Sequence, residues 1–369
     1  MTTLRVPFLS AAPHEDAAAV RAAIDRVLHS GWFILGPEVE AFEREFAAAA
    51  GAAHAVGVGT GTDAIALALR ALGIGPGDEV ITTPLSAAYT ALAIVMAGAQ
   101  PVFADIDASR LTIDPGANEA AITPRTRAIV PVHLYGQPAD MDAIARLAEE
   151  HSLAIVEDCC QAHLATCSGK PVGTIGSAGA FSFYPTKNLA ALGDGGAVVT
   201  NDAAVADRIR RLRNGGQTDR YHHQELGVNS RLDELQAAIL RARLPYLARW
   251  TSRRRQLAGD YRQLLSNAPI AVPAEHDSGH VYHLFPVLAP GGATARTALQ
   301  QHLAGAGIDT LVHYPVPITR QPAFAHLAPA ACRRADDVSA RVLSLPIHPT
   351  LDRPGVADVC AAIQRWQAS

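Results

Sequence analysis

The stretch AVGVGTGTDAIALALRALGIGPGDEVITTP, residues 55–84, decides the fold class of this chain. It begins with a short apolar run, passes through the glycine-rich turn 57–63 into an apolar helix-like segment, and ends in a second apolar run, 79–84. Two such runs joined by a helical pattern are typical of a βαβ unit, whose parallel strands are buried on both faces. The stretch therefore predicts an α/β fold.

Further short runs of the same kind follow, with helix-like segments such as Met141 to His151 between most of them. They are PVFADI (101–106), AIVPVH (128–133), LAIVED (153–158), AFSFYP (180–185) and GAVVTND (196–202). Together with AVGVG (55–59) and EVITTP (79–84) they predict a mostly parallel sheet covered by helices. Ligands of such sheets bind beyond the carboxyl ends of the strands, so the residues that close each run are the candidate site residues.

The length of 369 residues predicts two domains rather than one. Ser230, with Asp233 three residues later, predicts a capped helix start, and Pro245 interrupts that helix. The chain beyond about residue 269 mixes short apolar runs with helical ones, as a smaller α+β domain does. We therefore expect a large α/β domain over residues 1–245 and a small C-terminal domain over 246–369.

Composition and charge exclude several classes of protein. Apolar residues make up 49% and charged residues 18%, as in a globular chain. The net charge of −4 gives no overall basic field, so a nucleic-acid partner is not expected. No apolar stretch approaches the ~20 residues that a membrane span needs, and the N-terminus lacks a secretion signal. We expect a cytoplasmic protein without a membrane partner.

The five cysteines are too few and too irregularly spaced for a disulfide framework. Cys159, Cys160 and Cys167 lie close together in the sequence, but no CxxC or HxxxH pattern accompanies them. Free cysteine behaves as a small apolar residue, so we expect reduced, partly buried thiols and no metal site. The arginines at 249 and 253–255 follow Pro245, and we interpret them as a solvated helix face.

Three positions suggest cofactor chemistry. The small residues of the turn 57–63 let backbone N–H groups at a helix N-terminus approach a phosphate, although a tight turn alone explains them equally well. A dinucleotide site would need an acid where Thr82 and Thr83 end the next run. Asp158 closes a buried run, either as the partner of a cation or as a helix cap. Lys187 lies in a charge-poor segment, either as a desolvated nucleophile or as a surface lysine.

Together the three positions meet the requirements of pyridoxal 5'-phosphate (PLP). Its phosphate needs an anchor, its pyridinium nitrogen needs an acid, and its aldehyde is held by a lysine as a Schiff base.

The chain resembles the DegT/DnrJ/EryC1/StrS family of PLP-dependent sugar aminotransferases, from SGWFILGPEVEAFEREFA (30–47) almost to the C-terminus. The motifs that carry the resemblance are GTDAIALALRALGIGPGDEV (61–80), PVHLYGQPADMD (131–142), EDCCQAH (157–163), FSFYPTKNLAALGDGGAVVTND (181–202), GVNSRLDELQAAIL (227–240), HYPVP (313–317) and LSLPIHP (343–349). The resemblance implies fold type I, as in aspartate aminotransferase, with a seven-stranded sheet.

Residue roles follow from the resemblance by position. It implies that Lys187 forms the Schiff base, Asp158 partners the pyridine nitrogen and Gln161 binds the ring hydroxyl. The remaining implied roles are phosphate contacts at Gly61, Thr62 and Ser182, a phosphate contact from the neighbouring subunit at Asn229, and substrate contacts at His313 and Tyr314. His163 is a further candidate cofactor contact.

The chain also departs from the family pattern. Many relatives carry an aromatic residue that stacks on the cofactor at the position of Ala88, and Tyr89 is the candidate substitute. Cys159 and Cys160 replace common alanines, Leu164 replaces a glycine, and Thr319 and Arg320 replace a His-Leu pair. The wall around the ring and the substrate side therefore differ from those of many relatives.

The implied activity is transfer of an amino group from an amino acid, with glutamate expected, to a nucleotide-linked keto-deoxysugar in amino-sugar biosynthesis. The retained lysine disfavours the family's dehydratase branch, which has histidine there. Alternatives are a keto-cyclitol or other non-nucleotide acceptor, an amino-hydroxybenzoate synthase-like activity, or a PLP-binding regulatory protein. The resemblance also implies a homodimer with shared active sites.

Overall fold

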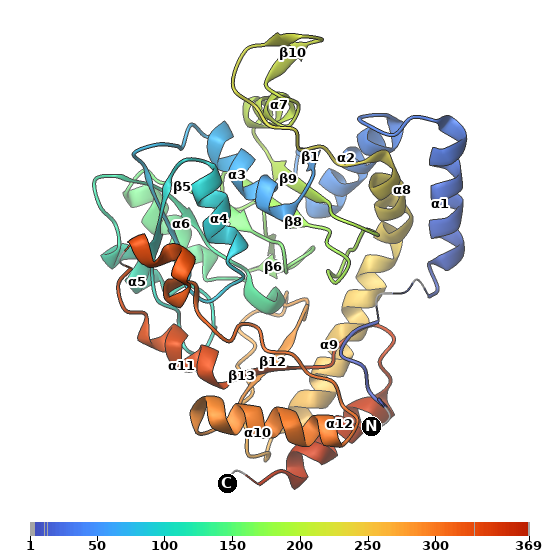
Figure 1. Ribbon diagram of the computed structural model, residues 1–369, viewed down its shortest axis with the longest axis vertical. Helices are drawn as coiled ribbons and strands as arrows, with labels where there is room; N and C mark the ends of the chain where they lie inside the picture. The colour runs from blue at the N-terminus through green and yellow to red at the C-terminus, as the bar shows by residue number, and fades with distance from the viewer. Residues whose placement is uncertain (1–3, 11, 13, 328, 368–369) are drawn as a thin grey trace.

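The computed structural model describes residues 4–10, 12, 14–327 and 329–367, and its central feature is a seven-stranded sheet (Figure 1). The strand order is β1-β9-β8-β5-β4-β2-β3. The strands are β1 (His54–Val58), β2 (Glu79–Thr82), β3 (Gln100–Phe103), β4 (Thr126–Val130), β5 (Ala154–Asp158), β8 (Ala178–Ser182) and β9 (Gly196–Thr200). Each apolar run predicted as a strand overlaps one of these seven.

The sheet is mostly parallel, as predicted. Strands β8, β5, β4, β2 and β3 pair in parallel, whereas β9 runs antiparallel to both β8 and β1. The connection from β8 to β9, residues 183–195, contains no helix, and a parallel crossover usually needs one. This short connection carries Lys187.

Helices cover both faces of the sheet and form two separate cores. One face packs against α3 (Gly61–Ala71), α4 (Tyr89–Met96) and α7 (Ala203–Leu212). The other packs against α2 (Pro37–Ala50), α5 (Pro115–Ala120), α6 (Met141–Glu150) and α8 (Glu234–Arg243). Helix α3 itself carries alanine, leucine or isoleucine on nearly every side, as a helix buried all round does, and it is almost entirely buried.

The helix predicted to begin at Ser230 begins instead at Glu234, four residues later. The Ser230 hydroxyl does not cap it, because it accepts a hydrogen bond from the Gly59 N–H (2.9 Å) and donates one to Asp63 (2.8 Å). The predicted interruption at Pro245 is confirmed. Helix α8 ends at Arg243, a 3₁₀ turn spans Leu244–Tyr246, and α9 (Leu247–Leu264) follows.

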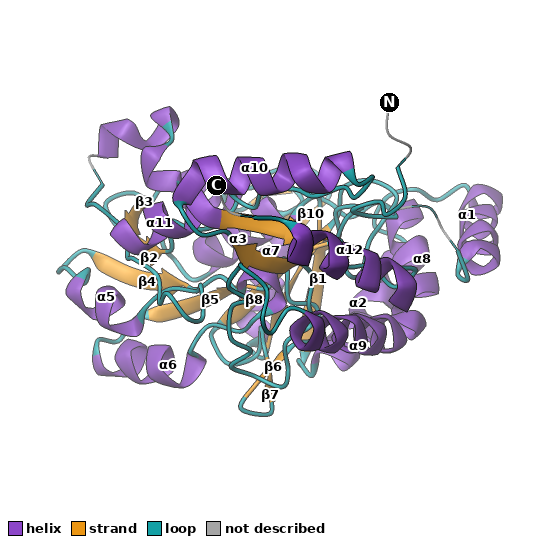
Figure 2. Ribbon diagram, turned by 90° about the horizontal axis from the view of Figure 1, so that it is seen from below, coloured by secondary structure: helices purple, strands orange, loops and turns teal. Residues whose placement is uncertain are grey.

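The C-terminal part combines helices with one antiparallel strand pair. Strands β12 (Phe285–Leu288) and β13 (Val342–Leu345) pair with each other. The helices α10 (Gly292–Gly305), α11 (Arg333–Arg341) and α12 (Arg353–Arg365) surround them, and α9 and α12 lie side by side (Figure 2). Val6 forms a parallel bridge with Ile308, so the beginning of the chain joins this part. The domain limit after residue 245 stays a prediction.

The remaining elements are peripheral. They are α1 (Ala17–Ser30), the short pairs β6 (Thr166–Cys167) with β7 (Lys170–Pro171) and β10 (Gln217–Asp219) with β11 (His222–His223), and the 3₁₀ turns Leu134–Gly136, Ile318–Arg320 and Pro322–Leu327. The β10–β11 hairpin projects from the body of the molecule (Figure 1). Among the described residues, no helix has both the length and the apolar character to cross a membrane.

One prediction about the arginine run after Pro245 is wrong. Arg254 is not on a solvated face, since its side chain is buried and only 3% of its surface is exposed. It lies on the buried stripe of α9, in helical register with Thr251, Ala258 and Tyr261. By contrast, the exposed Arg249 pairs with Glu15 (2.6 Å).

Candidate active site

The N-terminus of α3 meets the end of β8 at the carboxyl edge of the sheet. The Thr60 hydroxyl caps α3 by accepting a hydrogen bond from the Asp63 N–H (3.0 Å). A Cβ atom at Gly61 would lie 2.6 Å from the Cβ of Ser182 and 2.8 Å from the sulfur of Cys160. Only glycine fits this approach, so Gly61, Thr62 and Ser182 lie together around a helix N-terminus suited to a phosphate.

Asp158 ends β5 and is buried, with 4% of its surface exposed. Its Oδ2 accepts a hydrogen bond from the Thr90 hydroxyl (2.7 Å), and its Oδ1 accepts one from the Cys160 N–H (3.0 Å). No helix begins after Asp158, which excludes the helix-cap interpretation. Each carboxylate oxygen has a second lone pair, so Asp158 can still accept a bond from a protonated ring nitrogen.

Lys187 lies in the connection after β8, beside Asp158 and Cys160. Burial lowers the pKa of its ammonium group, while Cys160 and Asp158 oppose that shift. A lysine with a lowered pKa is a better nucleophile toward a carbonyl at neutral pH. Lys187 is half-buried, and its pKa responds to the charge of Asp158, which favours the desolvated nucleophile over a surface lysine.

Gln161 connects the sheet edge to the C-terminal part. Its Oε1 accepts a hydrogen bond from the Tyr135 N–H (2.7 Å), and its Nε2 donates one to the Tyr314 hydroxyl (2.9 Å). The Tyr135 hydroxyl donates to the carbonyl oxygen of His313. The structure thus brings Gln161, His313 and Tyr314 together, and one Nε2 hydrogen of Gln161 remains for a ligand.

Burial keeps the two C-terminal candidates uncharged at neutral pH. It lowers the pKa of His313 to about 4, with Lys187 adding to the shift, and raises the pKa of Tyr314 to about 12. His313 stacks on Phe8 and shares a hydrogen bond with the Ser344 hydroxyl (3.0 Å). Neutral donors and acceptors of this kind suit the hydroxyl groups of a sugar.

His163 is fully buried next to the end of β8, and its predicted cofactor contact stays a prediction. Its Nε2–H donates to the carbonyl oxygen of Ser182 (2.8 Å), and its ring packs against Phe181 and Phe183. Burial lowers its pKa to about 3, with a further contribution from Lys187. Its Nδ1 is buried without a partner in the described part of the chain. His163 therefore supports the backbone of Ser182.

Two predicted residues lie on the surface. Tyr89 is the first residue of α4 and is 65% exposed, next to Thr90, which contacts Asp158. Asn229 is exposed in the segment between the β10–β11 hairpin and α8, where it forms a bridge with Asn214. Its contact with the phosphate of a neighbouring subunit stays a prediction.

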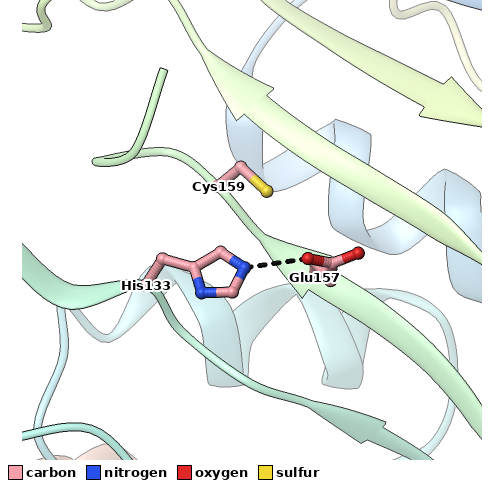
Figure 3. Close-up of side chains that lie close together, drawn as sticks. All are labelled: His133, Glu157 and Cys159. Carbon is pink, nitrogen blue, oxygen red and sulfur yellow. Dashed lines mark hydrogen bonds and ion pairs between the residues drawn. The ribbon is translucent and has the colours of Figure 1, made fainter. Parts of the chain in front are cut away.

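His133, Glu157 and Cys159 form a buried cluster whose ligand atoms lie within 4.8 Å of one another (Figure 3). The Ala139 N–H donates to His133 Nδ1 (3.0 Å), which places the imidazole hydrogen on Nε2, directed at Glu157 (3.0 Å). Glu157 also accepts three backbone N–H groups, from residues 173, 175 and 176. Hydrogen bonds thus use both imidazole nitrogens and both carboxylate oxygens, so the cluster is an internal network rather than a metal site. All five cysteines are free thiols.

Sequence reasoning missed Thr90, which orients Asp158, and Tyr135, which orients Gln161. Thr90 was detectable, because apart from Tyr89 it is the only polar residue of the helix YTALAIVM and it follows the end of a predicted strand. The contact of Tyr135 with Gln161 was not, since it joins two loops through a backbone N–H.

The residues present fit PLP. The absence of a side chain at Gly61 leaves space for a phosphate at the N-terminus of α3. Asp158 is a buried acid whose carboxylate can accept a further hydrogen bond. Its charge acts on Lys187. These three features converge on one edge of the sheet, as an anchored phosphate, a paired ring nitrogen and an aldehyde partner require.

The comparisons with known proteins agree with this geometry. A model of the DegT/DnrJ/EryC1/StrS aminotransferase family matches residues 14–364. The chain is 51% identical over 370 residues to the dTDP-3-amino-3,4,6-trideoxy-alpha-D-glucose transaminase of Streptomyces venezuelae, covering 99% of this chain and 97% of that protein. It is 48% identical over 365 residues to the erythromycin biosynthesis sensory transduction protein EryC1 of Saccharopolyspora erythraea, covering 97% and 99%.

Among solved structures, the chain matches the crystal structure of Streptomyces venezuelae DesV in complex with a ketimine intermediate. The TM-score is 0.95 at 50% sequence identity, with 99% of each chain covered. The predicted aminotransferase fold is therefore confirmed. The chain belongs to the DegT/DnrJ/EryC1/StrS aminotransferase family.

Proposed function

We propose that this protein transfers an amino group from an amino acid, with glutamate expected, to the keto group of a nucleotide-linked keto-deoxysugar, with PLP as its cofactor. The observation that carries the proposal is the convergence of Gly61, Asp158 and Lys187 at one edge of the sheet. The name of the Streptomyces venezuelae transaminase supports the choice of a sugar nucleotide.

The chain's own residues have distinct tasks in this reaction. When bound, PLP supplies an electron sink for the carbon from which a proton is removed. Asp158, oriented by Thr90, holds a proton on the pyridine nitrogen. Lys187 carries the proton between the two carbon positions, and its lowered pKa favours the unprotonated amine that this task needs. Gln161 binds the ring hydroxyl with its remaining N–H group.

The substrate side is formed by residues that burial keeps neutral. His313 and Tyr314 offer uncharged hydrogen-bonding groups to the sugar, held in place by Tyr135 and Gln161. Such groups bind hydroxyls without adding a charge beside the reacting carbon. This arrangement supports an acceptor rich in hydroxyl groups, as keto sugars and keto-cyclitols both are.

The function is tested by colour in two half-reactions. PLP-loaded protein should lose its yellow colour with L-glutamate, and dTDP-linked or UDP-linked keto sugars should restore it. Restoration only by a non-nucleotide keto-cyclitol would favour the alternative acceptor. A colour indifferent to every amino donor would favour a regulatory role, for which the name of the EryC1 relative is the specific observation.

We also propose that the protein is a homodimer in which Asn229 completes the partner's phosphate site. Asn229 is exposed and therefore free to contact a second chain. The test mixes an inactive Lys187→Ala chain with an inactive Asn229→Trp chain. If the site is shared, one of the two active sites of the heterodimer combines both lesions and the other active site has neither. About half of the sites in the heterodimer should therefore regain activity. No recovery after verified subunit exchange would contradict the shared site.

A further inference from the structure

Cys160 is the one cysteine of this chain that is not buried. All five cysteines belong to the described residues, and Cys160 is half-buried whereas the other four expose at most 4% of their surface. Cys160 comes two residues after the end of β5, at the carboxyl edge of the sheet where Asp158 lies. Because the reactivity of a thiol depends on access, Cys160 is the thiol that a small reagent reaches first.

The side chain of Cys160 lies among three residues of the proposed PLP site. Its sulfur lies against the turn at Gly61, where an added Cβ atom would be only 2.8 Å from it. Its backbone N–H donates a hydrogen bond to Oδ1 of Asp158 (3.0 Å). Burial raises the pKa of its thiol and the charge of Asp158 raises it further, whereas the charge of Lys187 opposes the shift. Cys160 is therefore next to the groups proposed for the phosphate, the ring nitrogen and the aldehyde.

The shape of PLP directs its ring to this sulfur. The ring nitrogen and the aldehyde are at opposite ends of the pyridine ring, and the phosphate arm branches next to the aldehyde. With the nitrogen at Asp158, the aldehyde at Lys187 and the phosphate at Gly61, the ring would fill the space among these residues. The Cys160 side chain begins near Asp158 and its sulfur reaches Gly61, so it follows the ring. Its thiol donates a long hydrogen bond, of 3.8 Å, to the carbonyl oxygen of Ala180, which leaves sulfur surface for a ligand.

We propose that the thiol of Cys160 lies against one face of the PLP ring, so that modification of this thiol and binding of the cofactor exclude each other. The inference rests on the PLP site of the proposed function. Sulfur is polarizable and makes favourable contacts with aromatic rings, so a thiol suits this place. Because its pKa is raised, the thiol stays uncharged at neutral pH and brings no negative charge near the phosphate.

The first test measures how fast methyl methanethiosulfonate labels cofactor-free protein. The thiolate attacks the divalent sulfur of the reagent, a disulfide to a methylthio group forms, and methanesulfinate leaves. Mass spectrometry should find the label on Cys160, and PLP at ten times its dissociation constant should slow the labelling about tenfold.

Inorganic phosphate separates the ring from the phosphate cradle in this test. At a concentration that measurably weakens PLP binding, phosphate should slow the labelling of Cys160 less than about twofold, because it leaves the ring position open. Protection by phosphate as strong as that by PLP would place the sulfur at the phosphate rather than at the ring and would overturn the proposal.

The converse test measures the affinity for PLP from its absorbance. Protein labelled at Cys160 should bind PLP at least about tenfold more weakly, because the methylthio group overfills the ring position, and dithiothreitol should restore binding. Labelled protein that binds PLP like the wild type would contradict the proposal.

Two alanine variants identify the thiol that is responsible. Cys160→Ala should bind PLP within about tenfold of the wild type, because only the contact of one sulfur is lost, and the reagent should no longer affect it. The matched control Cys159→Ala removes the neighbouring thiol, which lies in the buried cluster with His133 and Glu157 (Figure 3). It should bind PLP and react with the reagent as the wild type does. A Cys160→Ala protein that still loses PLP on treatment would assign the effect to another thiol and refute the contact.

Failure of this inference differs from failure of the proposed function. A wild type that shows no PLP absorbance at any PLP concentration counts against the proposed cofactor site as a whole. A wild type that binds PLP, yet is labelled at Cys160 as fast as the cofactor-free protein, overturns the contact of Cys160 alone.

Discussion

Replacing Glu157 by glutamine should destabilise the protein strongly, because its carboxylate accepts four hydrogen bonds in the core. The donors are three backbone N–H groups, from Gly173 (2.8 Å), Ile175 (2.9 Å) and Gly176 (2.8 Å), and His133 Nε2–H (3.0 Å). Glutamine keeps one oxygen, so its NH₂ group must face two of these donors. His133 cannot relieve the conflict by changing tautomer, because its Nδ1 already accepts the Ala139 N–H.

The magnitude follows from the donors left unpaired. A buried donor without a partner costs about 1–3 kcal/mol. Two unpaired donors therefore cost roughly 2–6 kcal/mol, a range that includes the usual penalty of about 3–5 kcal/mol for breaking a buried pair. This is a large fraction of the stability of a typical protein, about 5–15 kcal/mol.

The assay is urea unfolding of cofactor-free protein, with and without a chelator and added zinc. Glu157→Gln should lower the free energy of unfolding by the amount above. Neither the chelator nor zinc should change the unfolding curve of the wild type. As a control, Cys159→Ala removes the third member of the cluster and should cost only the packing of one buried sulfur, roughly 1–2 kcal/mol. A loss below about 1 kcal/mol for Glu157→Gln, or wild-type stability that depends on zinc, would refute the internal network.

Three further predictions concern the proposed site. Lys187→Ala should abolish turnover while leaving the unfolding curve nearly unchanged, and borohydride reduction of the PLP-loaded wild type should label the peptide of Lys187; a label on Lys170 would overturn the assignment. Asp158→Asn should lower the rate by orders of magnitude at saturating PLP, because a neutral amide does not hold the ring nitrogen protonated, and a near wild-type rate would contradict this role. Cofactor-free protein should lose stability as pH falls from about 6.5 to about 4, because buried His163 and His348 stay neutral when folded, with pKa values lowered to about 3 and about 4, but take up protons when unfolded. At pH 5 each should cost roughly 2 kcal/mol, and urea midpoints that do not change between pH 7 and pH 5 would show that they are not buried as neutral groups.

The elements of the sheet were predictable because their signal is local. A parallel strand buried on both faces must be apolar along its whole length, and each predicted run overlaps a strand for that reason. The antiparallel direction of β9 was not predicted, although the short connection that carries Lys187 contains no helical pattern and could have indicated it.

Two sequence predictions, the helix cap at Ser230 and the solvated face at Arg254, were wrong because they depend on contacts distant in sequence or on which side of a helix packs inward. Ser230 has the sequence pattern of a helix cap, yet its hydroxyl binds Gly59 and Asp63, which are distant in sequence. Arg254 belongs to a run of charged residues, and its neighbours Arg253 and Arg255 are less buried and donate to backbone carbonyl oxygens. Only the spacing of Thr251, Ala258 and Tyr261 around it would have placed it on the buried stripe of α9.

The strand order explains why the cofactor side of the site was more predictable than the substrate side. Asp158 is the last residue of β5, and β5 pairs directly with β8. In this pairing Asp158 lies opposite Ala180, and the segment that follows β8 carries Lys187. The acid and the lysine are therefore held by one rigid sheet. His313 and Tyr314 belong to the C-terminal part, and the hydrogen bonds of Tyr135 and Gln161 link them to the sheet edge. Substitutions in the C-terminal part can therefore alter which acceptor is bound without moving Asp158 relative to Lys187. For this reason we expect variants of His313 to change the KM for the acceptor while the reaction with glutamate keeps its rate.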